Sequence, residues 1–170
     1  DRIGPAAPSC YLMTQERKFI SRTGPADGCQ HLPYEGARGI DHADYIIMRA
    51  PHPTRVLAAE QDYFEIAAVR DACTQAGRVY AGLGCAERMD LFSYDDKHGF
   101  SKPRREKACQ WMRQWLLDDP AEVIEPEFQL QSEEALWATK TGQVATSYPD
   151  EISVGELNLR EAKRLGSARR

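Results

Sequence analysis

The sequence predicts an α/β fold in which about three parallel strands are flanked by helices. Two short apolar runs, 54–59 and 89–94, have the length and composition of buried strands. A segment with helical periodicity follows each run, and this alternation of strand and helix implies parallel strands joined by helical crossovers. A third short strand is expected at 6–12, where an apolar stretch leads into a loop.

Two helices are predicted from spacings of three and four residues between apolar side chains. In the segment 64–83, Gly84 follows at the position of a C-cap glycine, and one apolar face is formed by Ala68, Ala72, Ala76, Val79, Tyr80 and Leu83. In the segment 103–117 a proline occupies the first turn, and the apolar positions are Ala108, Trp111, Met112, Trp115 and Leu116. Both tryptophans are expected to face the sheet.

The remaining segments give weaker signals. Asp41 is a plausible N-cap for a short helix over 42–48 that stops before Pro51. The segment 24–39 is rich in glycine and proline and predicts an irregular surface excursion. After Pro120 the chain becomes more polar, and only 156–165 suggests a helix. We therefore interpret 119–170 as a linker or tail, which could lead to a further domain.

Composition limits the possible partners. The 170 residues include 22 Lys and Arg against 26 Asp and Glu, a formal net charge of −4. A mildly acidic chain argues against a nucleic-acid partner or an anionic membrane surface. No apolar run approaches the roughly 18–20 residues of a membrane span. Nothing in the sequence implies a cofactor.

The cysteines do not define a disulfide framework or a metal-binding motif. There are five, which is an odd number, their spacings are wide, and no C-x-x-C pair occurs: Cys10, Cys29, Cys73, Cys85 and Cys109. A structural zinc site is therefore not expected, and a complete set of disulfides is not implied. The cysteine pattern therefore favours neither an oxidising nor a reducing compartment.

Asp62 and His98 are the candidate catalytic residues. Each comes just after one of the two predicted strands, and parallel strands end at the same edge of a sheet. A carboxylate that meets a histidine there can fix the imidazole tautomer while the other ring nitrogen transfers a proton. Aspartate before histidine also matches the order Ser…Asp…His of α/β-hydrolases. The structural alternatives are an N-cap role for Asp62 and a turn role for His98.

Other polar residues have simpler interpretations. Glu60, Asp95 and Asp96 are rival acids, of which the last two are expected to shape a tight loop. His42 and Asp44 are two apart and do not share a helix face, so solvent or cap roles are favoured over a metal pair. The rest are expected to have ordinary structural roles: His31 and His52 on the surface, Ser9-Cys10 at a buried strand end, and the basic stretch 102–105 as a solvated helix start.

Three stretches together resemble bacterial α/β-hydrolases of the acetyl xylan esterase-like kind. They are Arg55-Val56-Leu57-Ala58-Ala59-Glu60-Gln61-Asp62-Tyr63-Phe64, Tyr94-Asp95-Asp96-Lys97-His98-Gly99-Phe100-Ser101, and the helix with Trp111 and Trp115. The resemblance implies that residues 1–118 are the C-terminal half of an α/β-hydrolase domain, with Asp62 and His98 as the acid and base of a Ser-Asp-His triad. A secreted or periplasmic location would follow if a signal peptide preceded the chain.

The chain departs from that family in one respect that matters for activity. It contains no G-x-S-x-G, the motif that carries the nucleophilic serine upstream of the segment at Ala6 in such enzymes. We expect a serine esterase part that is inactive alone and whose partners are an ester substrate and the missing upstream half of the domain. A prolyl-oligopeptidase-type peptidase fragment and a non-catalytic binding protein on the same scaffold remain alternatives.

Overall fold

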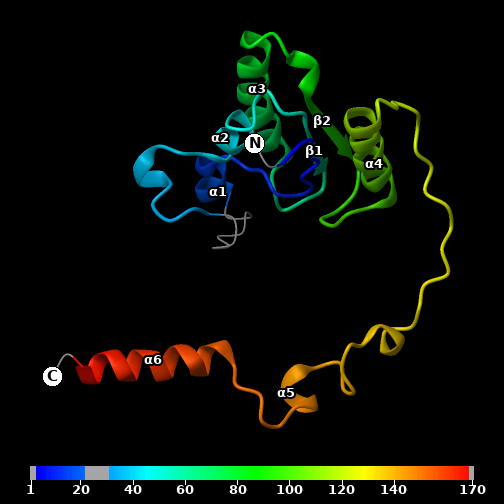
Figure 1. Cartoon of the computed structure of the whole chain (residues 1–170). Helices are drawn as coiled ribbons and strands as arrows, with labels where there is room; N and C mark the ends of the chain where they lie inside the picture. Colours follow the sequence, from blue (N-terminus) through cyan, green and yellow to red (C-terminus); the bar gives the residue numbers. More distant parts are fainter. Residues whose placement is uncertain (1–2, 22–30, 169–170) are drawn as a thin grey trace. The chain divides into compact units, whose positions relative to one another are not determined.

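The structure is a computed structural model that describes residues 3–21 and 31–168 (Figure 1). The chain divides into two compact units, Asp1–Pro126 and Glu127–Arg170. The first unit contains the sheet and the candidate site. Its last residues are held by Arg105, whose guanidinium pairs with the Glu125 carboxylate at 2.6 Å.

Two parallel strands form the centre of the first unit. Strand β1 (Thr54–Ala59) pairs with β2 (Met89–Tyr94) over their full lengths, with Thr54 opposite Met89 and Ala59 opposite Tyr94. The helix α3 (Ile66–Gly82) connects them, and α4 (Lys102–Leu117) follows β2. The α/β class predicted from the sequence is therefore confirmed, with strand bounds that match the two apolar runs.

The two helices cover opposite faces of the sheet (Figure 1). Val56 packs in the main core with Ala72 of α3, whereas the neighbouring Arg55 projects to the other face and its guanidinium lies 4.6 Å from the Trp111 ring of α4. This follows from the alternation of side chains along a strand. Trp111 is buried as predicted, and Trp115 is half-buried against it.

The expected third strand is present only as two isolated parallel bridges, Ala6 with Thr54 and Ser9 with Leu57. Ala6 N–H donates to Pro53 O, Arg55 N–H donates to Ala6 O, and Leu57 N–H donates to Pro8 O. The next bond in this ladder would run from residue 8 to the Arg55 carbonyl, and proline has no N–H to make it. The sheet therefore has two strands with an interrupted third neighbour.

The remaining elements of the first unit lie beside this sheet. Helix α2 (His42–Ile47) begins at Asp41 with a capping box that Asp44 completes, as the sequence suggested. Helix α1 (Gln15–Ser21) was not predicted. Two short 3-10 turns are η2 (Gly36–Arg38) and η3 (Ala86–Arg88). Most of the predicted excursion at 24–39 lies outside the described residues.

The second unit has little core. It contains η4 (Glu134–Leu136), α5 (Val144–Ser147) and α6 (Val154–Ala168), and none of its described residues is buried. Helix α6 includes the segment 156–165 that the sequence indicated. Within residues 3–21 and 31–168, no helix has the length and apolar character needed to cross a bilayer.

Candidate active site

The loops that follow β1 and β2 are bonded to each other at the carboxyl edge of the sheet. Glu60 N–H donates to Tyr94 O at 2.9 Å, and Gln61 N–H donates to Asp96 O at 2.9 Å. The side chain of Gln61 also donates to Asp95 Oδ1 at 2.7 Å. These bonds extend the parallel pairing past the strands and bring the next residues of each loop together.

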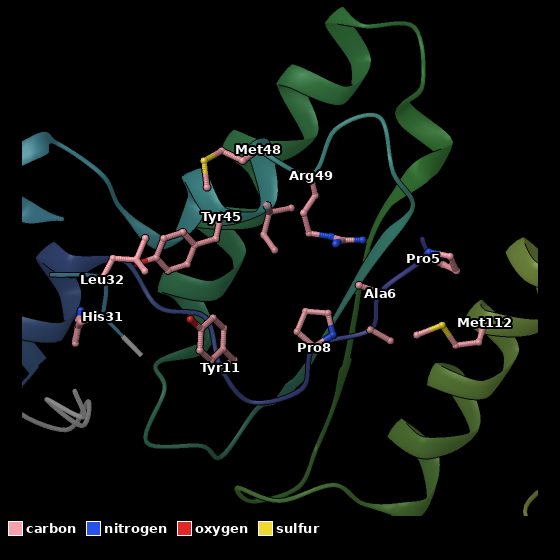
Figure 2. A pocket seen from close by; sticks show the side chains of 12 residues that line it. Pro5, Ala6, Pro8, Tyr11, His31, Leu32, Tyr45, Met48, Arg49 and Met112 are labelled. Carbon is pink, nitrogen blue, oxygen red and sulfur yellow. The ribbon is translucent and has the colours of Figure 1, made fainter. Parts of the chain in front are cut away.

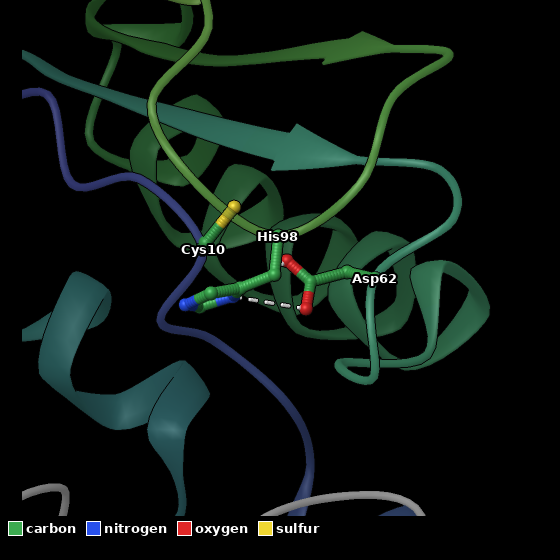
Figure 3. A group of neighbouring side chains, drawn as sticks. All are labelled: Cys10, Asp62 and His98. Carbon is green, nitrogen blue, oxygen red and sulfur yellow. Dashed lines mark hydrogen bonds and ion pairs between the residues drawn. The ribbon is translucent and has the colours of Figure 1, made fainter.

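Asp62 and His98 meet at this edge (Figure 3). His98 Nδ1 lies 3.1 Å from Asp62 Oδ1 and 3.2 Å from Oδ2. The Asp62 side chain is 1% exposed, whereas that of His98 is 42% exposed, so a buried carboxylate supports an accessible imidazole. Phe64 N–H also donates to Asp62 Oδ1 at 3.2 Å, which fixes the carboxylate.

The partners of the imidazole define its tautomer. The ionised carboxylate can only accept, so Nδ1 carries the proton and Nε2 has the lone pair. The Tyr63 hydroxyl lies 2.8 Å from Nε2 and donates to it, and the two rings stack with centroids 4.3 Å apart. The nitrogen that would receive a proton from a nucleophile therefore already accepts a hydroxyl hydrogen bond.

The rival acids have other partners. Glu60 Oε1 accepts from Arg70 Nη2 at 2.9 Å and from Ser93 Oγ at 2.7 Å. Asp96 binds Arg104, and Asp95 accepts from Gln61 as described above, so both shape the loop in the way the sequence suggested. Of the four acids, the structure brings only Asp62 to the imidazole.

Arg104 organises the loop that carries His98, and the sequence analysis missed it. Its side chain is fully buried, although the stretch 102–105 was expected to be solvated. The guanidinium donates to Asp96 Oδ2 at 3.0 Å, to Lys97 O at 3.0 Å and to Gly99 O at 2.7 Å. Gly99 has φ +148°, which favours glycine, so the turn after His98 depends on both residues.

Cys10 also reaches this group, from the end of the interrupted third strand (Figure 3). Its Sγ accepts from Arg104 Nη1 at 2.5 Å and donates to Gly99 O at 3.4 Å. Burial and a hydrogen bond with Asp62 raise the pKa of the thiol. The thiol is therefore poorly ionised at neutral pH, which argues against a nucleophilic role.

A pocket of about 600 Å³ opens beside the pair. Asp62, Tyr63 and His98 line it together with Glu60, Gln61, Glu65, Ile66 and Lys97. The imidazole therefore borders a space in which a substrate could be held.

A second polar cluster, the Glu35 cluster, lies between α1 and α2. The Glu35 carboxylate contacts His31, Tyr45 and Gln15, and Leu32 N–H donates to Oε2 at 3.0 Å. Burial alone would raise the pKa of Glu35, but the hydrogen bonds from Tyr45, His31 and Leu32 outweigh it and lower this pKa to about 2. Burial, with the bond to Glu35, raises the pKa of Tyr45 to about 12.

The structure corrects two expectations in this cluster. His42 is fully buried, where a solvent or cap role was expected, and His31 is largely covered instead of lying on the surface. His42 Nδ1 accepts from Met13 N–H at 3.2 Å, and Lys18 Nζ lies 2.5 Å from His31 Nε2. The contacting residues, Met13 for His42 and Lys18 for His31, are distant in the sequence, and no local sequence pattern encodes such contacts.

A second pocket, of about 690 Å³, is apolar and lies along the interrupted strand (Figure 2). Ala6 and Pro8 form one wall, and Tyr11, Tyr45 and Met112 are among the other lining residues. It contains neither Asp62 nor His98, so it is a separate feature from the candidate active site.

Comparisons with known proteins support the fold. No family model matches the chain, and no curated protein matches its sequence. The glucuronoyl esterase catalytic domain from Hypocrea jecorina aligns with a TM-score of 0.50 and 12% identity, over 77% of this chain and 41% of that domain. The methylesterase BT1017 aligns with a TM-score of 0.41 and 20% identity, over 50% of this chain and 20% of that one.

The chain thus spans less than half the length of each of these two structures. At 12% identity the first likeness concerns the arrangement of the backbone. The chain therefore shares the α/β architecture of part of the domain from Hypocrea jecorina.

Proposed function

We propose that this chain is part of a serine hydrolase that cleaves carboxylic esters, with Asp62 as the acid and His98 as the base of a Ser-Asp-His triad. The observation that carries the proposal is the bond from His98 Nδ1 to a carboxylate whose side chain is 1% exposed, at the carboxyl edge of two parallel strands. That edge is where open α/β sheets place their sites.

The geometry suits general base catalysis. With Nδ1 bonded to Asp62, Nε2 has the lone pair that could take a proton from an attacking hydroxyl once that hydroxyl replaces Tyr63, and the buried carboxylate stabilises the imidazolium that forms. The Tyr63 hydroxyl at Nε2 occupies the place where a serine hydroxyl would bind. The adjoining pocket would receive the ester.

The nucleophile and the oxyanion donors must come from elsewhere. The 170 residues contain no G-x-S-x-G, so a separate upstream part of the hydrolase domain is the partner we propose. Acetyl esters of plant polysaccharide are the first substrate class to test. Glucuronoyl esters are the second, because one structure of similar fold is a glucuronoyl esterase.

An activity assay tests this assignment. The purified chain should hydrolyse p-nitrophenyl acetate no faster than its own His98→Ala variant, because an acid–base pair without a nucleophile gives weak catalysis. Supplying the upstream part should produce saturable turnover. In that reconstituted enzyme His98→Ala should lower kcat by at least about a thousandfold, as loss of a triad member does.

The matched control is His52→Ala, the same substitution at a half-buried histidine whose backbone, not its ring, makes the hydrogen bonds described. Turnover should persist in it. Saturable turnover by the chain alone that survives Cys10→Ala and is lost in His98→Ala would mean that this chain contains its own nucleophile. Equal turnover in the His98→Ala and His52→Ala enzymes would rule out the triad.

A further inference from the structure

The carboxyl edge of the sheet brings together three side chains with the chemistry of metal ligands. Cys10, Asp62 and His98 each offer one ligand atom, and these atoms all lie within 4.8 Å of one another (Figure 3). They come from three separate segments: the end of the interrupted strand, the loop after β1 and the loop after β2. We propose that they form a binding site for a zinc ion, with water in the fourth position.

The distances fit a tetrahedral ion. Zinc bonds of about 2.0–2.2 Å to nitrogen and oxygen place adjacent ligand atoms about 3.3 Å apart. His98 Nδ1 lies 3.1 Å and 3.2 Å from the two Asp62 oxygens. The ion can therefore replace the shared proton of this pair with small movements, and the sulfur of Cys10 needs only to approach.

The ligand set selects zinc over the hard cations. One thiolate, one imidazole and one carboxylate are the ligand types that zinc accepts, whereas magnesium and calcium require oxygen ligands throughout. An open fourth position matches the 42% exposure of the His98 side chain. Arg104 Nη1 donates to Cys10 Sγ at 2.5 Å, and a zinc-bound thiolate can keep this bond because its sulfur, unlike an imidazole nitrogen, has more than one lone pair. The charge of Arg104 is compensated by Asp96, whose Oδ2 lies 3.0 Å from its Nη2.

Zinc binding changes the protonation of Cys10 and His98. The thiol of Cys10 loses its proton to solvent as the zinc–sulfur bond forms, since a coordinating thiol is deprotonated. His98 stays neutral: the proton leaves Nδ1, another binds at Nε2, and the Tyr63 oxygen, 2.8 Å away, accepts from it. One net proton is released per ion bound.

The Glu35 cluster is the competing group of metal-ligating residues among those described. Its His42 Nδ1 already accepts from Met13 N–H at 3.2 Å, and the ammonium of Lys18 lies against His31. A backbone donor and a cation thus occupy the places that a metal would need. The site at Cys10 has the accessible imidazole and the thiol that the Glu35 cluster lacks.

Zinc binding would oppose the proposed hydrolysis. The ion takes the lone pair of the imidazole and the carboxylate that orients it, so the base is lost. This consequence rests on the proposed function, but the binding does not. The experiment therefore measures binding to the 170-residue chain, which needs no activity.

A competition titration of zinc against a chromophoric chelator is the first measurement. The chain should bind one zinc ion. Cys10→Ser should weaken the affinity by at least about tenfold, because loss of a residue that only supports a metal ligand already has an effect of this size. The matched control is Cys109→Ser, because Cys109 is a free, exposed thiol outside the cluster. Its affinity should equal that of the unaltered chain.

A second measurement avoids substitutions. Zinc should slow alkylation of Cys10 by iodoacetamide, read by peptide mass mapping, while Cys109 reacts at an unchanged rate. Equal alkylation of Cys10 with and without zinc would overturn the proposal. So would equal affinities in the Cys10→Ser and Cys109→Ser chains, or an affinity that is lost in His31→Gln and retained in Cys10→Ser.

Discussion

At the scale of single residues, Arg104 connects the most distant parts of the candidate active site. Its Nη1 donates to Ser9, Cys10 and Gly99, and its Nη2 donates to Asp96. A charge with no exposed surface is tolerated because each direction of the planar group meets an acceptor. The position of His98 relative to Asp62 therefore depends on a residue that need not take part in the chemistry.

Replacing Arg104 should be costly. In Arg104→Met the carboxylate of Asp96 and the carbonyls of the loop lose their donor, so the free energy of unfolding should fall by about 3–5 kcal/mol. Urea denaturation measures it. Arg105→Met is the control, because that side chain is 41% exposed and its ion pair is screened by solvent, so its loss should change the free energy of unfolding much less. Similar losses in both variants would show that Arg104 is not a structural centre.

The lowered pKa of Glu35 predicts that the folded chain loses stability in acid. Its folded pKa of about 2 lies below the ordinary value of 4.5, so the unfolded chain binds more protons between these values. The contribution of Glu35 is complete above pH 4.5 and disappears as the pH falls toward 2. Glu35→Gln should flatten this part of the curve of unfolding free energy against pH, whereas the exposed Glu122→Gln should leave it unchanged. An unaltered slope in Glu35→Gln would contradict the assignment.

The sequence anticipates the pair at the site but not its surroundings. Asp62 and His98 could be placed together because both follow parallel strands, and parallel strands end at one edge. The burial of His42 could not be foreseen, since its partner Met13 is far away in the chain, and Arg104 meets the distant Ser9 and Cys10 as well as its own loop. Their partners are set by tertiary packing, which leaves no periodic trace in the sequence.

At the scale of elements, the segment at Ala6–Ser9 shows how one residue decides whether a strand forms. Its apolar sequence predicted a third strand, and its bonds to β1 follow a parallel ladder except at Pro8. Strands β1 and β2 contain no proline and pair throughout. Helix α1, in contrast, forms although the sequence did not predict it. Its residues QERKFIS are too few and too polar to show an apolar face.

Pro8→Ala should supply the missing bond. The new N–H can donate to the Arg55 carbonyl, so its amide should exchange with solvent more slowly than that of an unpaired residue such as Ala7. Hydrogen exchange followed by nuclear magnetic resonance measures both rates. Exchange at residue 8 as fast as at Ala7 would show that the segment is held apart from β1 by something other than proline.

At the scale of the whole molecule, the first unit has an exposed sheet edge. The interrupted strand at 6–9 forms hydrogen bonds to β1 along one of its two edges, and the apolar pocket of about 690 Å³ lies along that same segment. An unpaired edge next to apolar surface favours association. The comparison with the esterase catalytic domain, of which the chain spans 41%, is compatible with further strands adding there.

The isolated chain should therefore be marginally stable or self-associate. Sedimentation velocity should show species larger than a 19.2 kDa monomer as the concentration increases. Amides of 6–9 should also be less protected from exchange than those of β1. A stable monomer with equal protection in both segments would indicate that the unit is self-sufficient, and the upstream partner would then be unnecessary.

The contacts around His98 have a consequence for how a complete enzyme would assemble. Asp62, His98 and the arginine that fixes their loop all belong to one folded unit, so their ordering entropy is lost when that unit folds. An arriving nucleophile would meet an imidazole already oriented and would have only to exchange places with the Tyr63 hydroxyl. Association would then carry mainly the cost of lost translation and rotation. The proton-transfer half of the catalyst would be preorganised before the half that forms the covalent bond is present.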